Sequence, residues 1–173
     1  ANKSTRVSPV SAKDVAEEFK GSLKLILNGG NCKIGLESTV VDLTSTPKIL
    51  RPGFINPDQL SKKLSKTINV SKGTKSIKSP GMLKRHYSPG IPIKLNQKQA
   101  SKNEAFIVFG KKYKKSKNTF NLSAKSNLTE AAKNLYKTLR VIKNKNYKMI
   151  HVSPIPKTGL GLAINDRLKR AAK

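Results

Sequence analysis

The chain has 173 residues, of which 36% are hydrophobic, so it can build the core of one ordinary domain or of two small ones. Its 36 Lys and Arg stand against 9 Asp and Glu, and the resulting net charge of +27 favours polyanionic partners such as nucleic acids or nucleotides. The single cysteine excludes an internal disulfide, and the two distant histidines argue against a structural zinc cluster. No apolar run reaches the roughly 20 residues that cross a bilayer. We therefore expect a cytoplasmic protein with no membrane partner.

The first 70 residues predict alternating short helices and strands. In SAKDVAEEFKG, Ser11 is a plausible N-cap and Gly21 a stop signal. The β-branched run at 39–43 is typical of a buried strand, and Pro52-Gly53 ends the strand that follows it. The predicted elements are a helix from Ser11, a strand at 23–27, a strand at 39–43, a strand from Ile49, and a helix opened by Asn56.

Residues 71–92 hold glycine and proline at close intervals without a sustained period, which predicts a linker and a domain boundary. Beyond it, strands are predicted at 106–110 and 149–152, and a helix at 128–142. The last segment predicts a helix with one apolar face that begins near the Gly-Leu-Gly triplet, which is too short for a dinucleotide-binding fingerprint. The order strand, helix, strand, helix indicates a small α/β layer, and the charge run KKYKKSK is expected to be a solvated loop.

One stretch, GLESTVVDLTSTPKILRPGFI, places hydroxyl groups and an arginine at two strand ends. Ser38 and Thr39 lie where a turn enters the first strand, and Arg51 lies where the second strand ends. If these ends are neighbours, the side chains converge on a pocket for a carboxylate or a phosphate. The alternative, an ordinary surface strand pair, is the reading that the residues alone favour.

Two other segments could join such a pocket. Asn2 and Ser8 lie on a loop ahead of the first helix, a place where phosphate is often bound. His86 and Tyr87, in KRHYSP, lie among prolines and could form a tethered lid, although a plain basic linker is the alternative. No Ser-His-acid arrangement and no acid pair indicates a reaction.

Five strings, in this order, resemble the long-form threonylcarbamoyl-AMP synthases: ANKSTRVSP, GLESTVVDLT, ILRPG, SPGMLKRHYSP and GLGLAINDRLKRAA. The resemblance implies an α/β fold in three parts. Residues 1–70 would be the C-terminal portion of the twisted-sheet catalytic domain, 71–92 an extended interdomain linker, and 93–173 a small Rossmann-like α/β C-terminal domain.

The resemblance also implies an activity. These nucleotidyltransferases make threonylcarbamoyl-AMP from L-threonine, bicarbonate or CO2, and ATP, and release pyrophosphate; the product serves threonylcarbamoyladenosine modification of tRNA. Mg²⁺ is expected with ATP, no metal ligand is assigned in the chain, and tRNA, other double-stranded RNA and tRNA-modification proteins are further candidate partners. The implied site residues are Asn2, Ser8, Val10, Arg51 and Tyr87 for ATP, and Ser38 for threonine.

The sequence departs from the family pattern at its start. The serine of the family's serine-x-asparagine signature would precede Ala1, and the lysine-x-arginine motif and threonine-binding loop are absent, so no catalytic residue is assigned. We therefore expect a fragment that is inactive alone. Thr5 also occupies a position where the family often has glycine. The rival hypothesis is a non-enzymatic basic RNA- or tRNA-binding module, against which stands an aromatic content of only 5%.

Overall fold

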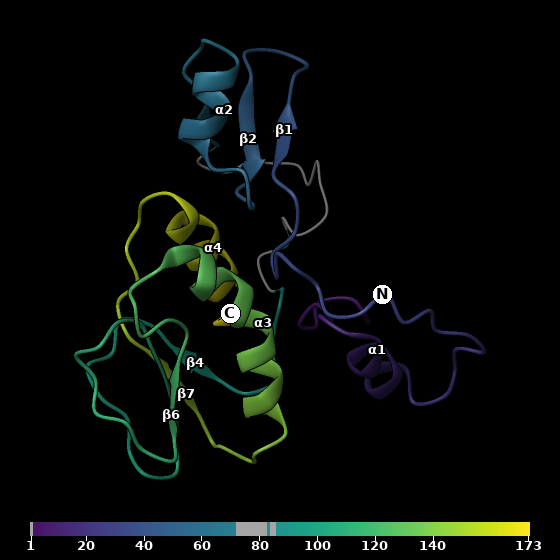
Figure 1. The fold of residues 1–173 in the computed structure, drawn as a ribbon, viewed down its shortest axis with the longest axis vertical. Helices are drawn as coiled ribbons and strands as arrows, with labels where there is room; N and C mark the ends of the chain where they lie inside the picture. The colour runs from purple at the N-terminus through teal and green to yellow at the C-terminus, as the bar shows by residue number, and fades with distance from the viewer. Residues whose placement is uncertain (1, 72–82, 84–85) are drawn as a thin grey trace.

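The computed structural model describes residues 2–71, 83 and 86–173, so most of the predicted linker lies outside the described residues. Its elements form two sheets with four helices (Figure 1). In chain order they are α1 (Ala12–Phe19), β1 (Val40–Asp42), β2 (Lys48–Arg51), α2 (Pro57–Lys63), β3 (Asn69–Val70), β4 (Ile93–Lys94), β5 (Ala105–Val108), β6 (Thr119–Asn121), α3 (Leu128–Lys143), β7 (Ile150–Val152) and α4 (Leu160–Ala171). No helix in these ranges is long and apolar enough to cross a membrane.

The smaller sheet has the order β1-β2-β3 and lies with α2 at one end of the long axis (Figure 1). β1 and β2 form an antiparallel hairpin whose register shifts after Val40, which lies opposite Arg51. α2 begins where predicted, because Asn56 caps it and Gln59 completes a capping box. The hairpin brings the segment before β1 next to the end of β2.

The larger sheet is parallel, with the order β4-β7-β5-β6. Strand, helix and strand alternate from β6 through α3 to β7, and the chain ends in α4, as the predicted α/β layer requires. β5 is buried along its whole length, and α3 and α4 pack against each other and contribute to one core with the strands. The predicted α/β class is confirmed.

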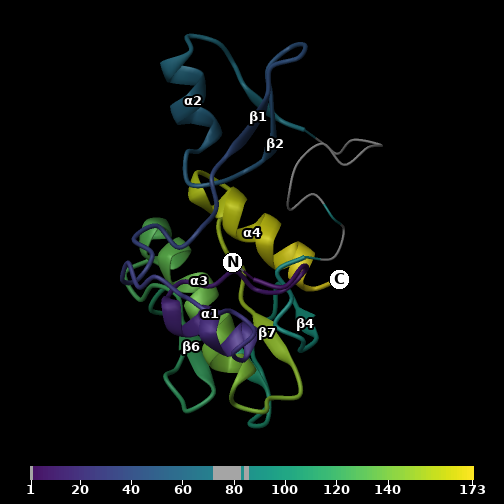
Figure 2. The same cartoon turned by 90° about the vertical axis from the view of Figure 1, so that its right-hand side faces the viewer.

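The N-terminal segment packs on α3. Arg140 of α3 donates to the Val7 carbonyl at 2.6 Å and the Ser8 carbonyl at 3.2 Å. Glu18 of α1 lies 3.6 Å from Arg140 Nη2 and 3.9 Å from Lys143 Nζ. Figure 2 shows α1 in front of α3. Ion pairs and hydrogen bonds to carbonyl groups therefore hold together residues that are far apart in the chain. The domain limits at 70 and 92 stay a prediction.

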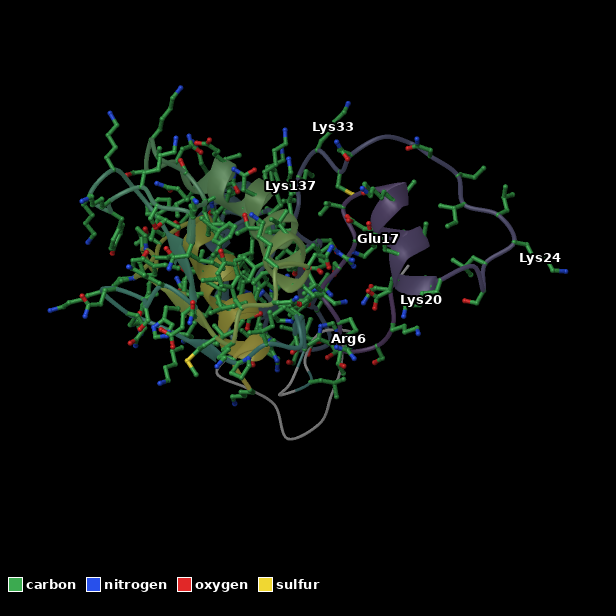
Figure 3. The ribbon with its side chains drawn as sticks, turned by 90° about the horizontal axis from the view of Figure 1, so that it is seen from below. Arg6, Glu17, Lys20, Lys24, Lys33 and Lys137 are labelled. Carbon is green, nitrogen blue, oxygen red and sulfur yellow. The ribbon has the colours of Figure 1, made fainter. Side chains whose placement is uncertain are left out.

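One predicted strand was wrong and three short ones were missed. Residues 23–27 form no strand, and Leu25 and Leu27 are 77% and 84% exposed, because no strand of the described chain pairs with them. Figure 3 shows Lys24 at the outer end of this loop, directed away from the molecule. The buried strand predicted at 39–43 is shorter, and Leu43 is exposed. β3, β4 and β6 have only two or three residues each, too few to show a period.

Candidate functional site

Arg51 and Ser38 meet at the end of the hairpin. Arg51 is buried, and its Nε and Nη2 atoms donate to the Ser38 carbonyl at 3.2 and 3.0 Å. Nη2 also lies 3.3 Å from Ser38 Oγ. Ser38 itself is exposed, so a ligand can reach it. The two strand ends are therefore neighbours, as the sequence predicted, and the guanidinium has a fixed orientation beside an accessible hydroxyl.

Gly53 allows the turn after β2 to lie against the segment before β1. A Cβ atom at this position would overlap backbone atoms of Ser38 and Thr39 and would lie 2.6 Å from the Glu37 carbonyl oxygen. Because all three neighbours are backbone atoms, they cannot rotate away. The Ser38 backbone is thus packed from the side of the turn.

We expect Gly53→Ala to lower the free energy of unfolding by about 1–3 kcal/mol, the usual cost of overpacking. Gly29→Ala is the matched control, because a Cβ atom at position 29 would meet nothing within 4 Å. Urea unfolding followed by circular dichroism measures both variants. Equal stabilities for the two would contradict the close packing at position 53.

Glu37 is the centre of a hydrogen-bonded cluster that joins four segments. Its carboxylate accepts from Ser8 Oγ at 2.6 Å, from Tyr136 Oη at 2.8 and 3.0 Å, and from Arg167 Nε at 3.0 Å. Arg167 is fully buried, and its Nη1 donates to Asp166 at 2.8 Å. Burial, together with the Glu37 charge, raises the pKa of Tyr136 well above its ordinary value, so this hydroxyl remains a donor.

The Glu37 cluster makes stability depend on acidic pH. Burial alone would raise the pKa of Glu37, but Arg167 and the hydrogen bonds from Ser8 and Tyr136 outweigh it and hold the pKa below the ordinary 4.5. The stabilisation is therefore complete above the unfolded pKa and is lost as pH falls through the lower folded pKa. We expect urea midpoints to decline more steeply below pH about 4.5 in the wild type than in Glu37→Gln. Parallel declines would contradict this assignment.

Tyr87 lies beside the same cluster. It is 1% exposed, its ring stacks on Tyr136 with 5.8 Å between centroids, and Arg167 Cζ lies 5.1 Å from its ring centroid. Burial raises the pKa of Tyr87, and the positive charge of Arg167 acts in the opposite direction. Its φ of 61° is a left-handed backbone conformation that a bulky residue rarely adopts. Tyr87 is therefore connected through Arg167 to Glu37, the chain neighbour of Ser38, which contacts Arg51.

Three buried polar atoms around Tyr87 have no hydrogen-bond partner within the described part of the chain. They are the Tyr87 hydroxyl, His86 Nδ1 and Arg167 Nη2. Burial and the positive charge of Arg167 lower the pKa of His86, and they outweigh the negative charge of Glu37, which raises it. The imidazole is therefore neutral at pH 7. Buried groups of this kind are normally satisfied, so the cluster is suited to a polar ligand.

The predicted nucleotide loop is folded mainly on itself. Asn2 Nδ2 donates to the carbonyls of Lys3 at 2.9 Å and Arg6 at 3.3 Å. The Val10 N–H is bonded to Asp14 Oδ2 at 2.8 Å, within the cap of α1, and the Ser8 hydroxyl is bonded to Glu37. These donors already have hydrogen-bond partners within the chain. The three residues could therefore contact a nucleotide only through their carbonyl or apolar groups, or after a local rearrangement. Their binding roles stay predictions.

Ser8 and Val10 do line a cavity of about 420 Å³ with mostly apolar walls. Its volume falls within the range typical of small-molecule sites. Glu37 reaches into the same cavity and is the chain neighbour of Ser38. The cavity is lined by Ser8, Pro9, Val10, Cys32, Lys33, Ile34, Gly35, Leu36, Glu37 and Tyr136. The apolar walls suit a flat ring, and Glu37 connects the cavity along the chain to Ser38, which contacts Arg51.

Comparison with known proteins decides the family. Residues 55–173 match the family model described as "Threonylcarbamoyl-AMP synthase, C-terminal domain". The chain belongs to the threonylcarbamoyl-AMP synthase family. Residues 1–53 match a second family model, described as "Telomere recombination". The resemblance inferred from five motifs is thereby confirmed.

Curated relatives agree with this family. The chain is 33% identical to the threonylcarbamoyl-AMP synthase of Pyrococcus abyssi over 193 residues and 30% identical to that of Bacillus subtilis over 197 residues. These matches cover 99% of the chain but only 56% and 55% of the relatives. The chain therefore spans about half the length of the synthases it matches.

Solved structures of P. abyssi Sua5 have the same fold. The complex with L-threonine matches with a TM-score of 0.83 and 31% identity, over 99% of this chain and 56% of that one. A variant with adjacent histidine-to-alanine and tyrosine-to-alanine substitutions matches with a TM-score of 0.80 and 28% identity, over 99% and 55%.

Three residues of this candidate site were not predicted from the sequence: Tyr136, Arg140 and Arg167. All three lie on the buried faces of α3 and α4. Arg167 lies seven residues after Leu160 and three after Ile164, so it shares the apolar face that the sequence predicted for the last helix. An arginine on a predicted apolar face, in a chain that otherwise uses lysine, was the available signal.

Proposed function

We propose that this chain forms the part of a threonylcarbamoyl-AMP synthase that binds L-threonine and ATP, for threonylcarbamoyladenosine modification of tRNA. The observation that carries the proposal is the contact of Arg51 with Ser38, next to the Glu37 cluster against which Tyr87 packs. The names of the relatives, and the complex of one of them with L-threonine, support it.

The proposed reaction is an adenylyl transfer. The amine of L-threonine takes up carbon dioxide or bicarbonate as a carbamate, and a carbamate oxygen attacks the α-phosphorus of ATP. The bond from this phosphorus to the oxygen of the β-phosphate breaks, and pyrophosphate leaves. Negative charge spreads over the α-phosphate in the transition state, where a fixed guanidinium such as Arg51 is most stabilising.

Each site residue has a proposed role. The exposed Ser38 hydroxyl would bind threonine, and the Arg51 guanidinium, oriented by the Ser38 carbonyl, would hold the nucleotide phosphates. His86-Tyr87 is the one adjacent histidine-tyrosine pair in the sequence, as in the pair replaced in the P. abyssi variant. We assign it to covering ATP, whose polar groups would satisfy the buried Tyr87 hydroxyl. Asn2, Ser8 and Val10 would contact the nucleotide from the cavity side.

Mg²⁺ is proposed to arrive with ATP. Within the residues that the structure describes, no group of three or more His, Cys, Asp and Glu could hold a metal ion. The carboxylates nearest the site, Glu37 and Asp166, are instead paired with Arg167. The cation would therefore be held by phosphate oxygens, and the chain would neutralise phosphate through Arg51.

Turnover is proposed to need more than this chain. The matched relatives are nearly twice as long, and their other half has no counterpart here. We therefore expect weak binding of ATP and L-threonine by the chain, and pyrophosphate release only when the remaining half of a synthase is supplied.

The binding test is a titration of the ¹⁵N-labelled chain with L-threonine and with MgATP. Resonances of Ser38 and its neighbours should move with threonine, and those of Arg51 and Tyr87 with MgATP. Ser38→Ala should weaken threonine binding about 5- to 10-fold, the effect of losing one hydrogen bond. Ser45→Ala, on the exposed turn at the other end of the hairpin, is the matched control. Threonine shifts that survive Ser38→Ala unchanged would overturn the assignment.

The net charge of +27 favours a second candidate, a basic module that binds tRNA or other double-stranded RNA. Every described lysine except Lys48 is exposed, and residues 111–117 form the solvated loop that the charge run predicted. Titration with tRNA at several salt concentrations separates the two functions. Tight, steeply salt-dependent binding without any response to threonine or ATP would favour the module.

A further inference from the structure

We propose that Tyr136 of α3 and Arg167 of α4 are positioning residues for the Ser38–Arg51 pair and that they act through Glu37. The proposal rests on the proposed function in taking this pair as the binding site. It assigns a task to the C-terminal helices, in which the sequence indicated no site residue.

The first step is that the two C-terminal side chains are rigidly held. Tyr136 and Arg167 are 1% and 0% exposed, and both helices belong to one core with the parallel sheet. Arg167 is fixed further by Asp166, which accepts from Nη1 at 2.8 Å, and by the Tyr87 ring. Rigid donors of this kind impose a position on the group that they bind.

The second step is that the group they bind is the chain neighbour of Ser38. Glu37 receives hydrogen bonds from both residues, at 2.8 and 3.0 Å, across 99 and 130 positions of the chain. Arg51 in turn uses the carbonyl and the hydroxyl of Ser38. Because Ser38 is joined directly to Glu37, a displacement of the Glu37 backbone would move the Ser38 carbonyl and hydroxyl with it. An anchored Glu37 side chain therefore restrains the orientation of Arg51.

The third step is that the restraint acts from two sides. Gly53 packs against the backbone of residues 37–39 from the hairpin side, and the Glu37 cluster holds the same peptide from the C-terminal side. α3 also holds the nucleotide loop, since Arg140 binds the Val7 and Ser8 carbonyls. The C-terminal helices thus pre-organise both candidate binding segments, which lowers the entropic cost of binding a ligand.

The test is the exchange of the Arg51 Nε–H proton with solvent, measured by NMR on the ¹⁵N-labelled 173-residue chain. Tyr136→Phe removes one donor to Glu37 and keeps the ring. Arg51 Nε–H exchange should accelerate about fivefold, the effect of losing one hydrogen bond, while the amides of β5 keep their protection. Tyr147→Phe is the matched control, because its hydroxyl donates to the Lys117 carbonyl at 3.3 Å, on an exposed loop. Glu37→Gln, which also keeps its shape, should reproduce the faster exchange.

Unchanged Arg51 exchange in both Tyr136→Phe and Glu37→Gln would overturn the proposal. Faster exchange together with loss of β5 protection would also overturn it, because the effect would then be general loosening. A threonine titration separates this from the proposed function. Selective acceleration at Arg51 in a chain that binds neither threonine nor ATP would support the coupling and refute the proposed function.

Discussion

Arg51→Ala should weaken binding of MgATP by about 10- to 100-fold, because hydrogen bonds to a charged group contribute about 1.5–3 kcal/mol and each 1.4 kcal/mol is a factor of ten. Isothermal titration calorimetry of the chain measures the effect. Arg51→Lys should lie between the wild type and Arg51→Ala, since it keeps the charge and loses the paired donors.

The control for this experiment is Lys48→Ala, which removes a positive charge from the other end of β2, where Lys48 Nζ lies 3.8 Å from Asp42. It should leave the dissociation constant nearly unchanged. If Lys48→Ala weakened MgATP binding as much as Arg51→Ala, the phosphates would be responding to the general field of a chain with a charge of +27, and the assignment to Arg51 would fail.

Arg167→Met should have the largest effect on stability. Removal of one partner from a buried ion pair costs about 3–5 kcal/mol, since the other charge is left uncompensated. The cost should be near the lower end here, because Glu37 is 23% exposed. Here the remaining charge is Glu37, which would keep only its hydroxyl donors. Urea unfolding, followed by circular dichroism, measures the free energy of unfolding.

Arg170→Met is the matched control for Arg167→Met. Arg170 pairs with the same carboxylate of Asp166 at 3.0 Å, but it is 20% exposed, so its loss should cost about 1 kcal/mol or less. The double variant Glu37→Gln, Arg167→Met should be more stable than the sum of the single effects, because no unpaired charge remains. Equal losses in the two arginine variants, or strict additivity, would contradict a buried pair.

Local chemistry made some of the fold predictable. Ser11 and Asn56 cap helices because a side-chain oxygen accepts from a backbone N–H only three residues away. A strand also needs a partner, and that requirement is not local. Residues 23–27 have a strand-like composition but lack a partner in the described chain, and β6 forms only because β5 lies beside it.

In the candidate site, too, local contacts could be predicted from the sequence and long-range contacts could not. Ser38 and Arg51 could be predicted to meet, since one hairpin connects them. Tyr136 and Arg167 could not, because they reach Glu37 across 99 and 130 positions and helical periodicity shows only that a residue is buried, not what it contacts.

Arginine and lysine have different places in this structure. Arg51, Arg140, Arg167 and Arg170 each donate to backbone carbonyls, to carboxylates or to both. Lysine is almost always on the solvated surface. The planar fork of arginine can hold two acceptors in fixed geometry, which a lysine ammonium cannot do. These four arginines therefore join segments that are separated along the chain.

The contacts of Arg140 with the Val7 and Ser8 carbonyls span 133 and 132 positions. During translation, Val7 and Ser8 must therefore leave the ribosome long before α3 exists to contact them. Contacts of such long sequence separation form late and slowly. Until α3 has been made, the contacts of these two carbonyls with Arg140 cannot form, so this part of the fold is completed only late in synthesis.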